Sequence, residues 1–427
     1  MTLLAPRPPA SHDNEGKTIV RDEHQALEES GADGICGLCG TALTGENSSR
    51  EHIIPNAIGG RKRVSNFLCT PCNSTTGSEW DDELVRQLTP LCTMLNVKRS
   101  RGRNRSFVVE TVSDRKLTLD SDGTMGIADP LFEAHELAGK TTVQIRARTM
   151  RELKGMLSGL KKKHPQLDVD EVMKQAEPVQ EYSDEPYAIP LSVGGAVAGR
   201  SMVKSCLAMV HDVGLTTDQC EEAKHYLLSG GKPCFGFYTK RDLVRNRPEK
   251  TFFHCVHVQG DPERRQILAY VEYFGCLRFV AWLSRDYKGC AFSHCYTVDP
   301  VTGKELDLDI VLDIDPADLA EIDDGGAVDY GEVARALGVL VGAWKEMDVE
   351  RARTHAIDDA IAFACAECGV SEGDILSDEQ AAQFARLVSG RMTPYLMHTI
   401  LASRLTEDDR RVIQQKLKES RTEPGSV

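Results

Sequence analysis

The stretch that decides the N-terminal fold opens with Cys36-Gly-Leu-Cys39 and closes with Cys69-Thr-Pro-Cys72. A Cys-x-x-Cys turn lets two thiolates face one ion, and two such turns supply the four soft ligands that tetrahedral zinc prefers. Four thiolates leave no position for a substrate, so we expect this zinc ion to be structural. The segment between the two turns is longer than in a simple zinc ribbon, which indicates that a further unit is inserted there.

The insert contains Glu51-His52 at the start of a short apolar strand, and Asn73 follows the second cysteine pair directly. A histidine can act as a neutral base near pH 7, which the hydrolysis of a phosphodiester bond needs. Carboxylate and amide oxygens are the ligands that a hard divalent cation prefers. These side chains therefore make a hydrolytic site beside the zinc site a reasonable hypothesis.

In this arrangement the chain resembles the HNH nuclease family, which has a ββα-metal fold with an embedded four-cysteine zinc site. The resemblance rests on Glu51-His52, Asn66 and Cys72-Asn73 within the two cysteine pairs, and it covers roughly residues 33–90. It implies that His52 is the general base, that Asn66 holds the loop and orients His52, and that Glu51 and Asn73 bind a catalytic Mg²⁺ or Mn²⁺. The last of these positions is often histidine in the family, whereas here it is Asn73.

The resemblance predicts a metal-dependent endonuclease that hydrolyses the phosphodiester bonds of nucleic acid, with DNA the favoured substrate. Two other interpretations stay open. The first is a zinc-dependent module that binds nucleic acid without cleaving it, and the second is a protein-interaction scaffold stabilised by zinc. The sequence does not distinguish DNA from RNA and gives no recognition sequence. Double-strand cleavage with one site per chain would favour a homodimer.

Basic side chains gather around the expected site although the whole chain is acidic. The 427 residues carry 51 Lys and Arg against 65 Asp and Glu, a formal charge of −14, but residues 50–105 hold ten basic and five acidic side chains. Such a segment can meet a polyanion even on an acidic protein. The expected phosphate contacts are Arg61, Lys62, Arg63, Lys98, Arg99, Arg101, Arg103 and Arg105.

The overall composition is that of a globular protein and excludes a wholly disordered or fibrous chain. No apolar run is long enough to span a membrane, and the N-terminus lacks the pattern of a secretory signal. Ten of the 14 cysteines lack paired metal-site spacing or lie mostly in apolar segments, as small buried side chains do in a reducing compartment. We therefore expect a cytoplasmic protein with no membrane partner.

We expect an α+β fold in four parts along the chain. These are a flexible leader at 1–30, the HNH domain at 31–105, a mixed α/β domain of unknown role at 106–335 and a helical region at 336–427. Helical spacing of Trp80, Leu84 and Leu88 predicts a helix over 78–88. A cluster of strands between 252 and 298 without intervening helices predicts an antiparallel sheet. Further predictions are strands at 188–193 and 305–314 and helices at 330–345, 351–368, 378–387, 394–404 and 408–418.

Overall fold

The computed structural model describes residues 34–137, 140–176, 186–189, 191–324, 326–371 and 373–403. It has an α+β architecture in which a ββα unit comes first and two long helices come last, so the expected fold class is confirmed. The predicted leader at 1–30 and the predicted helix at 408–418 lie outside the described residues. In the part that the structure describes, no helix has the length and apolar character needed to cross a membrane.

The ββα unit starts with two antiparallel strands, β1 (Ser48–His52) and β2 (Arg63–Cys69), joined through the short 3₁₀ turn η1 (Asn56–Ile58). Directly after β2 come α1 (Thr70–Thr76), the π-helical turn η2 (Gly77–Asp81) and α2 (Asp82–Met94). The helical region therefore extends beyond the predicted 78–88 at both ends. Pro71 lies in the first turn, where the missing amide hydrogen costs no helical hydrogen bond.

A six-stranded sheet, here called the central sheet because it is built from the middle part of the chain, has the order β13-β10-β11-β12-β9-β14. Its antiparallel part confirms the prediction made from the strand cluster. The short β14 forms the edge of the sheet opposite β13, and it pairs in parallel with β9. The strands are β9 (Phe235–Tyr238), β10 (His254–Asp261), β11 (Gln266–Tyr273), β12 (Leu277–Ser284), β13 (Phe292–Val298) and β14 (Gly326–Ala327).

The strand predicted at 305–314 is wrong. This segment makes only isolated bridges, in which Glu305 pairs with Val298 and Ile310 pairs with Val244. Its alternating apolar side chains instead cover one face of the sheet, where Ile310, Leu312 and Ile314 join a buried cluster with sheet residues. The alternation of apolar and acidic residues therefore indicates an extended segment with one buried side. Such a segment need not form hydrogen bonds with a neighbouring strand along its whole length.

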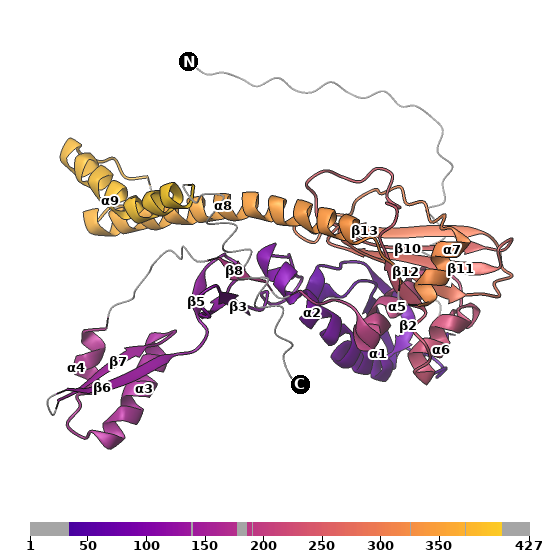
Figure 1. The fold of residues 1–427 in the computed structure, drawn as a ribbon, viewed down its shortest axis with the longest axis horizontal. Coiled ribbons are helices and arrows are strands. Elements are labelled where there is room, and N and C mark those ends of the chain that lie inside the picture. Colours follow the sequence, from indigo (N-terminus) through magenta and orange to yellow (C-terminus); the bar gives the residue numbers. More distant parts are fainter. Residues whose placement is uncertain are drawn as a thin grey trace, which may run out of the picture.

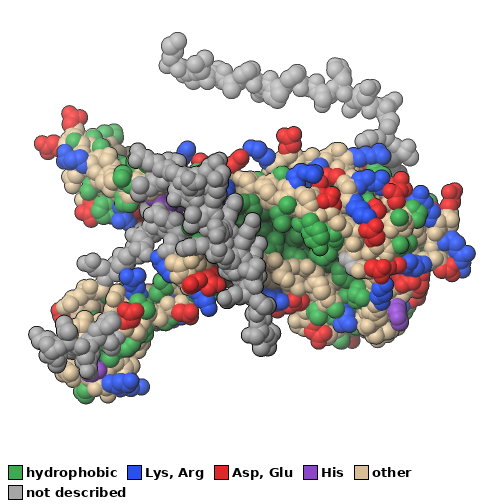
Figure 2. Space-filling view, viewed as in Figure 1, with side chains coloured by type: hydrophobic (Ala, Val, Ile, Leu, Met, Phe, Trp, Pro, Cys, Tyr) green, Lys and Arg blue, Asp and Glu red, His purple; other side chains and the backbone are tan. Residues whose placement is uncertain are grey.

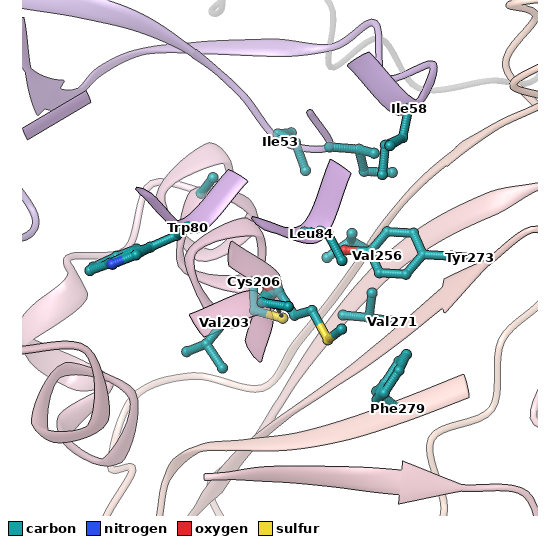
Figure 3. Close-up of a cluster of buried hydrophobic side chains, with 14 of the residues drawn as sticks. Ile53, Ile58, Trp80, Leu84, Val203, Cys206, Val256, Val271, Tyr273 and Phe279 are labelled. Atoms are coloured by element: carbon teal, nitrogen blue, oxygen red, sulfur yellow. Dashed lines mark hydrogen bonds between the residues drawn. The ribbon is translucent and has the colours of Figure 1, made fainter. Parts of the chain in front are cut away.

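The other face of the sheet is covered by α5 (Gly195–Asp212), which lies between the sheet and the ββα unit (Figure 1). Side chains from all three layers meet in one hydrophobic cluster. Figure 3 shows Ile53 and Leu84 of the ββα unit, Val203 and Cys206 of α5, and sheet residues such as Val256 together. The turn η3 (Thr217–Gln219) and α6 (Glu221–Ser229) follow α5. The division into domains stays a prediction, but this core crosses the expected boundary at residue 105.

Two smaller units follow the ββα unit along the chain. A four-stranded sheet has the order β5-β4-β3-β8, with β3 (Phe107–Thr111), β4 (Lys116–Leu119), β5 (Met125–Ile127) and β8 (Tyr187–Ala188). The strand predicted at 188–193 is therefore shorter and starts earlier. The hairpin of β6 (Leu131–Leu137) and β7 (Lys140–Arg146) forms an outlying lobe with α3 (Met150–Lys163) and α4 (Val169–Lys174), as Figure 1 shows.

As far as residue 403, where the described part of the chain ends, the C-terminal part is helical, as predicted, but with fewer and longer helices. After α7 (Pro316–Asp323), α8 runs without a break from Tyr330 to Cys368, so the two helices predicted there are one. The helices predicted at 378–387 and 394–404 also join, into α9 (Asp378–Ser403), with Pro394 inside it. α9 folds back along α8 (Figure 1). Acidic and basic side chains are interspersed over the visible surface (Figure 2).

Candidate metal and catalytic site

The four predicted zinc ligands come together in the structure. The Sγ atoms of Cys36, Cys39, Cys69 and Cys72 all lie within 4.8 Å of one another, and those of Cys39 and Cys69 are 3.7 Å apart. A tetrahedron with Zn–S bonds of about 2.3 Å has sulfur–sulfur edges of about 3.8 Å. These four cysteines could therefore bind a metal such as zinc. Hydrogen bonds with Thr41 lower the pKa of the Cys39 thiol to about 6, whereas burial raises the pKa of the Cys69 and Cys72 thiols.

The first cysteine pair is held against the rest of the molecule through its glycine. Thr217 of η3 donates a hydrogen bond from Oγ1 to the carbonyl oxygen of Gly37 at 3.0 Å. A Cβ atom on Gly37 would lie 2.9 Å from the methyl group of Thr217 and 3.0 Å from the ring of Phe67. Only glycine allows this close approach, so the cysteine turn depends on a contact from the central region as well as on its own sequence.

Three predicted catalytic and metal-binding residues, Glu51, His52 and Asn73, line one pocket of about 350 Å³, and Asn73 directly follows Cys72 of the cysteine cluster. Glu51 and His52 reach it from the end of β1, and Asn73 reaches it from α1. Asp81 lines the same pocket from the end of the π-helical turn η2. Such turns widen a helix locally and often occur at functional sites. The pocket thus combines three carboxylates, of Glu51, Asp81 and Asp82, with the amides of Asn56 and Asn73 and one imidazole.

Two of the pocket carboxylates, those of Glu51 and Asp81, share a buried lysine from α5. Lys204 is only 1% exposed, and its Nζ donates to Glu51 Oε1 at 2.5 Å and to Asp81 Oδ2 at 2.6 Å. Burial alone would lower the pKa of Lys204, but Asp81 and Glu51 together raise it above its ordinary value. Burial raises the pKa of Glu51 as well, although the charge of Lys204 acts against this shift. Ser201, one helical turn earlier, donates from Oγ to Asp81 Oδ1 at 2.5 Å. Two side chains of α5 therefore fix the position of Asp81.

Burial and its neighbours keep His52 neutral. Desolvation, together with the nearby charges of Arg63, Lys204 and Arg61, lowers the pKa of His52 to about 4. Arg63, its cross-strand partner on β2, donates from Nε to His52 Nε2 at 2.9 Å. Because Nε2 accepts this bond, the neutral ring carries its proton on Nδ1. His52 therefore has the protonation state of a base, with its accepting nitrogen in contact with Arg63.

Asn66 lies elsewhere in the hairpin and does not make the contact that the sequence predicted. It has a left-handed backbone conformation, with a φ of 59°, where the pairing of β1 with β2 is irregular. Its Oδ1 accepts a hydrogen bond from Ser48 Oγ at 2.8 Å. Among the described residues, the side chain that bonds the His52 ring is Arg63. The structure therefore gives Asn66 a role in shaping the hairpin.

The eight predicted phosphate contacts fall into different settings. Arg99 and Arg105 line the pocket, and so does Arg50, which is not among the predicted contacts. Lys62 and Arg61 bond to other parts of the protein. The Nζ atom of Lys62 lies 2.5 Å from a carboxylate oxygen of Asp212, and the guanidinium of Arg61 donates to the backbone carbonyl of Lys98. Arg63 contacts His52, while Lys98, Arg101 and Arg103 lie outside the pocket lining. Of the five basic side chains between residues 98 and 105, two therefore line the pocket.

Sequence reasoning missed two important acidic and basic partners, Asp81 and Lys204. Asp81 lies four residues after Gly77 and eight after Asn73, so helical spacing places all three on one face of a helix. Lys204 stands inside the apolar run Met202 to Val210. A lysine in such a run signals a buried ion pair, because an unpaired charge is rarely buried. Its partners, which are more than 120 residues away, were not readable from the sequence.

No curated protein and no solved structure matches this chain. Residues 36–89 match the family model described as HNH endonuclease. This match begins at the first clustered cysteine and includes β1, β2, α1 and the π-helical turn that carries Asp81. The resemblance expected from the sequence is thus confirmed, because the segment that builds the cysteine cluster and most of the pocket is similar to HNH endonucleases.

Proposed function

We propose that this protein is a metal-dependent endonuclease that hydrolyses phosphodiester bonds of nucleic acid, with DNA as its first candidate substrate. The observation that carries the proposal is the convergence of Glu51, His52, Asn73 and Asp81 on one pocket. The family match at 36–89 supports the same reaction class.

The donor set of the pocket fits a hard divalent ion. Glu51 and Asp81 offer carboxylate oxygens and Asn73 offers an amide oxygen, which are the ligands of Mg²⁺ and Mn²⁺. Such an ion, when bound, would neutralise charge on the phosphate and on the leaving oxygen. The four cysteines offer soft ligands only, so the two sites favour different metals, with zinc at the cysteine cluster.

In this proposal His52 takes a proton from the attacking water. Its Nε2 is the nitrogen that can accept, and Arg63 occupies it in the structure. A substrate phosphate attracts a guanidinium strongly, because the two form paired charge-assisted hydrogen bonds. Arg63 would therefore turn to the phosphate and leave His52 Nε2 to the water. Arg99, Arg105 and Arg50, which line the same pocket, would hold the flanking phosphates.

The test is plasmid cleavage by zinc-loaded wild type and by His52→Ala, each with and without added Mg²⁺ or Mn²⁺. We expect nicking or linearisation that needs the added metal and falls at least about a hundredfold in the variant, as the loss of a general base does. The matched control is His225→Ala, an exposed histidine on α6 away from the pocket, which should cleave like wild type.

Two outcomes would count against the proposal. If wild type binds DNA or RNA in a salt-dependent way but cleaves neither with any metal, the non-catalytic binding module is the better description. If it shows no salt-dependent affinity for either polymer, the scaffold interpretation is favoured. Parallel assays on single-stranded and double-stranded DNA and on RNA then decide the substrate.

A further inference from the structure

Lys204 is a buried charge from outside the segment that resembles HNH endonucleases. It lies in the middle of α5, where every residue from Ala198 to Val210 except Arg200 is buried. An ammonium group loses most of its hydration in such a place and needs ionic partners there. The partners are Glu51 and Asp81, and Lys204 itself is not among the side chains that line the pocket. It therefore holds both carboxylates from behind the pocket.

The same two carboxylates are the strongest metal ligands of the proposed site. A divalent ion at about 2.1 Å from Glu51 Oε1 would lie within about 5 Å of Lys204 Nζ, because that oxygen is 2.5 Å from the nitrogen. The carboxylates of Glu51 and Asp81 together carry two negative charges. The positive charge of Lys204 reduces the net charge of the three groups to minus one. Repulsion between the ammonium and the ion is strong in this setting, since little water screens it.

We propose that Lys204 is a tethered counter-ion of the metal site, which keeps Glu51 and Asp81 together in the metal-free protein and weakens the binding of the divalent ion. The inference rests on the proposed function, because it needs Glu51 and Asp81 to be metal ligands. Its consequence is that the position of α5 sets the metal affinity. Since α5 packs against the central sheet, a ligand or partner that shifts this helix would change metal occupancy.

The test compares Mn²⁺ binding by full-length, zinc-loaded wild type and Lys204→Met, with free Mn²⁺ measured by electron paramagnetic resonance. Methionine keeps most of the length of the side chain and removes its charge. We expect Lys204→Met to bind Mn²⁺ at least about tenfold more tightly, because a neighbouring positive charge is gone. We also expect its melting temperature to fall without Mn²⁺ and to rise more on adding Mn²⁺ than that of wild type, since the ion replaces the missing cation.

A second pair of variants keeps the test decisive if Lys204→Met does not fold. Asp81→Asn leaves a neutral Glu51–Lys204 pair, and adding Lys204→Met restores the single negative charge of the wild-type cluster. The double variant should bind Mn²⁺ more tightly than Asp81→Asn alone. Equal or weaker binding on losing the lysine, in either background, would show that Lys204 only orders the carboxylates and would overturn the inference.

The design separates this inference from the proposed function. Glu51→Gln serves as the control that identifies binding at the pocket, and it should abolish the Mn²⁺ isotherm in wild type. If wild type and Lys204→Met both bind Mn²⁺ at the pocket with equal affinity, the inference fails and the endonuclease proposal stands. If neither binds and Glu51→Gln changes nothing, the metal site itself is wrong and both fail.

Discussion

The buried histidine His254 connects the central sheet to the loop that carries the pocket, and it predicts how the protein responds to acid. Its Nε2 lies 2.8 Å from the carbonyl oxygen of Ile58 in η1, and its Nδ1 accepts the backbone N–H of Phe274 at 3.1 Å. The neutral ring carries its proton on Nε2, so it donates one hydrogen bond from Nε2 and accepts one at Nδ1. A second proton on Nδ1 would face the N–H of Phe274, and no water could solvate it, because His254 is 0% exposed.

The size of the effect follows from the pKa of His254, which burial lowers from 6.5 to about 4. As the pH falls below 6.5, the unfolded chain takes up the proton first, so stability is complete above pH 6.5 and declines towards pH 4. Between pH 7 and pH 5 the loss from this one group is about 2 kcal/mol. That is a large fraction of the stability of an ordinary domain.

The measurement is urea unfolding at pH 7 and pH 5, followed by tryptophan fluorescence, for wild type and His254→Asn. Asparagine keeps an acceptor near the position of Nδ1 and cannot titrate. The variant should be less stable at both pH values but should lose about 2 kcal/mol less between them than wild type does. The comparison removes the contribution of other acid-sensitive groups, which both proteins share. If the two proteins lose stability equally, the ring is not held neutral and the reasoning is wrong.

Three further predictions concern the cysteine cluster and the pocket. Cys36→Ser should reduce bound zinc from about one ion per chain to nearly none and lower the melting temperature, measured by metal analysis and calorimetry; retained zinc would contradict the four-thiolate site. Arg99→Gln should weaken nucleic-acid binding and reduce the salt slope by about one, more than Arg101→Gln outside the pocket; equal effects would show that the pocket does not position the substrate. Arg63→Ala should raise the pKa of His52 from about 4 towards 6.5, because a neighbouring cation is removed, and an NMR titration without such a shift would argue against this contact.

Local patterns were sufficient for the ββα unit. Two cysteine pairs, a Glu-His pair and a helix after the second pair all depend on side chains close in sequence, and their chemistry is specific. The same is true of the antiparallel strands of the central sheet, because their apolar runs are separated by clear turns. Where the pattern was ambiguous, as at 305–314, alternation predicted a strand but the segment only packs its apolar side chains on the sheet.

The sequence by itself predicted the four cysteines that come together and the resemblance to HNH endonucleases that residues 36–89 show. Tertiary structure alone brought Lys204 of α5 between Glu51 and Asp81, paired Lys62 with Asp212, and placed His254 under the loop at Ile58. These contacts join residues 123 to 196 positions apart. Burial removes the water that would otherwise satisfy such charges and ring nitrogens, so only the packed fold decides which partner each one finds.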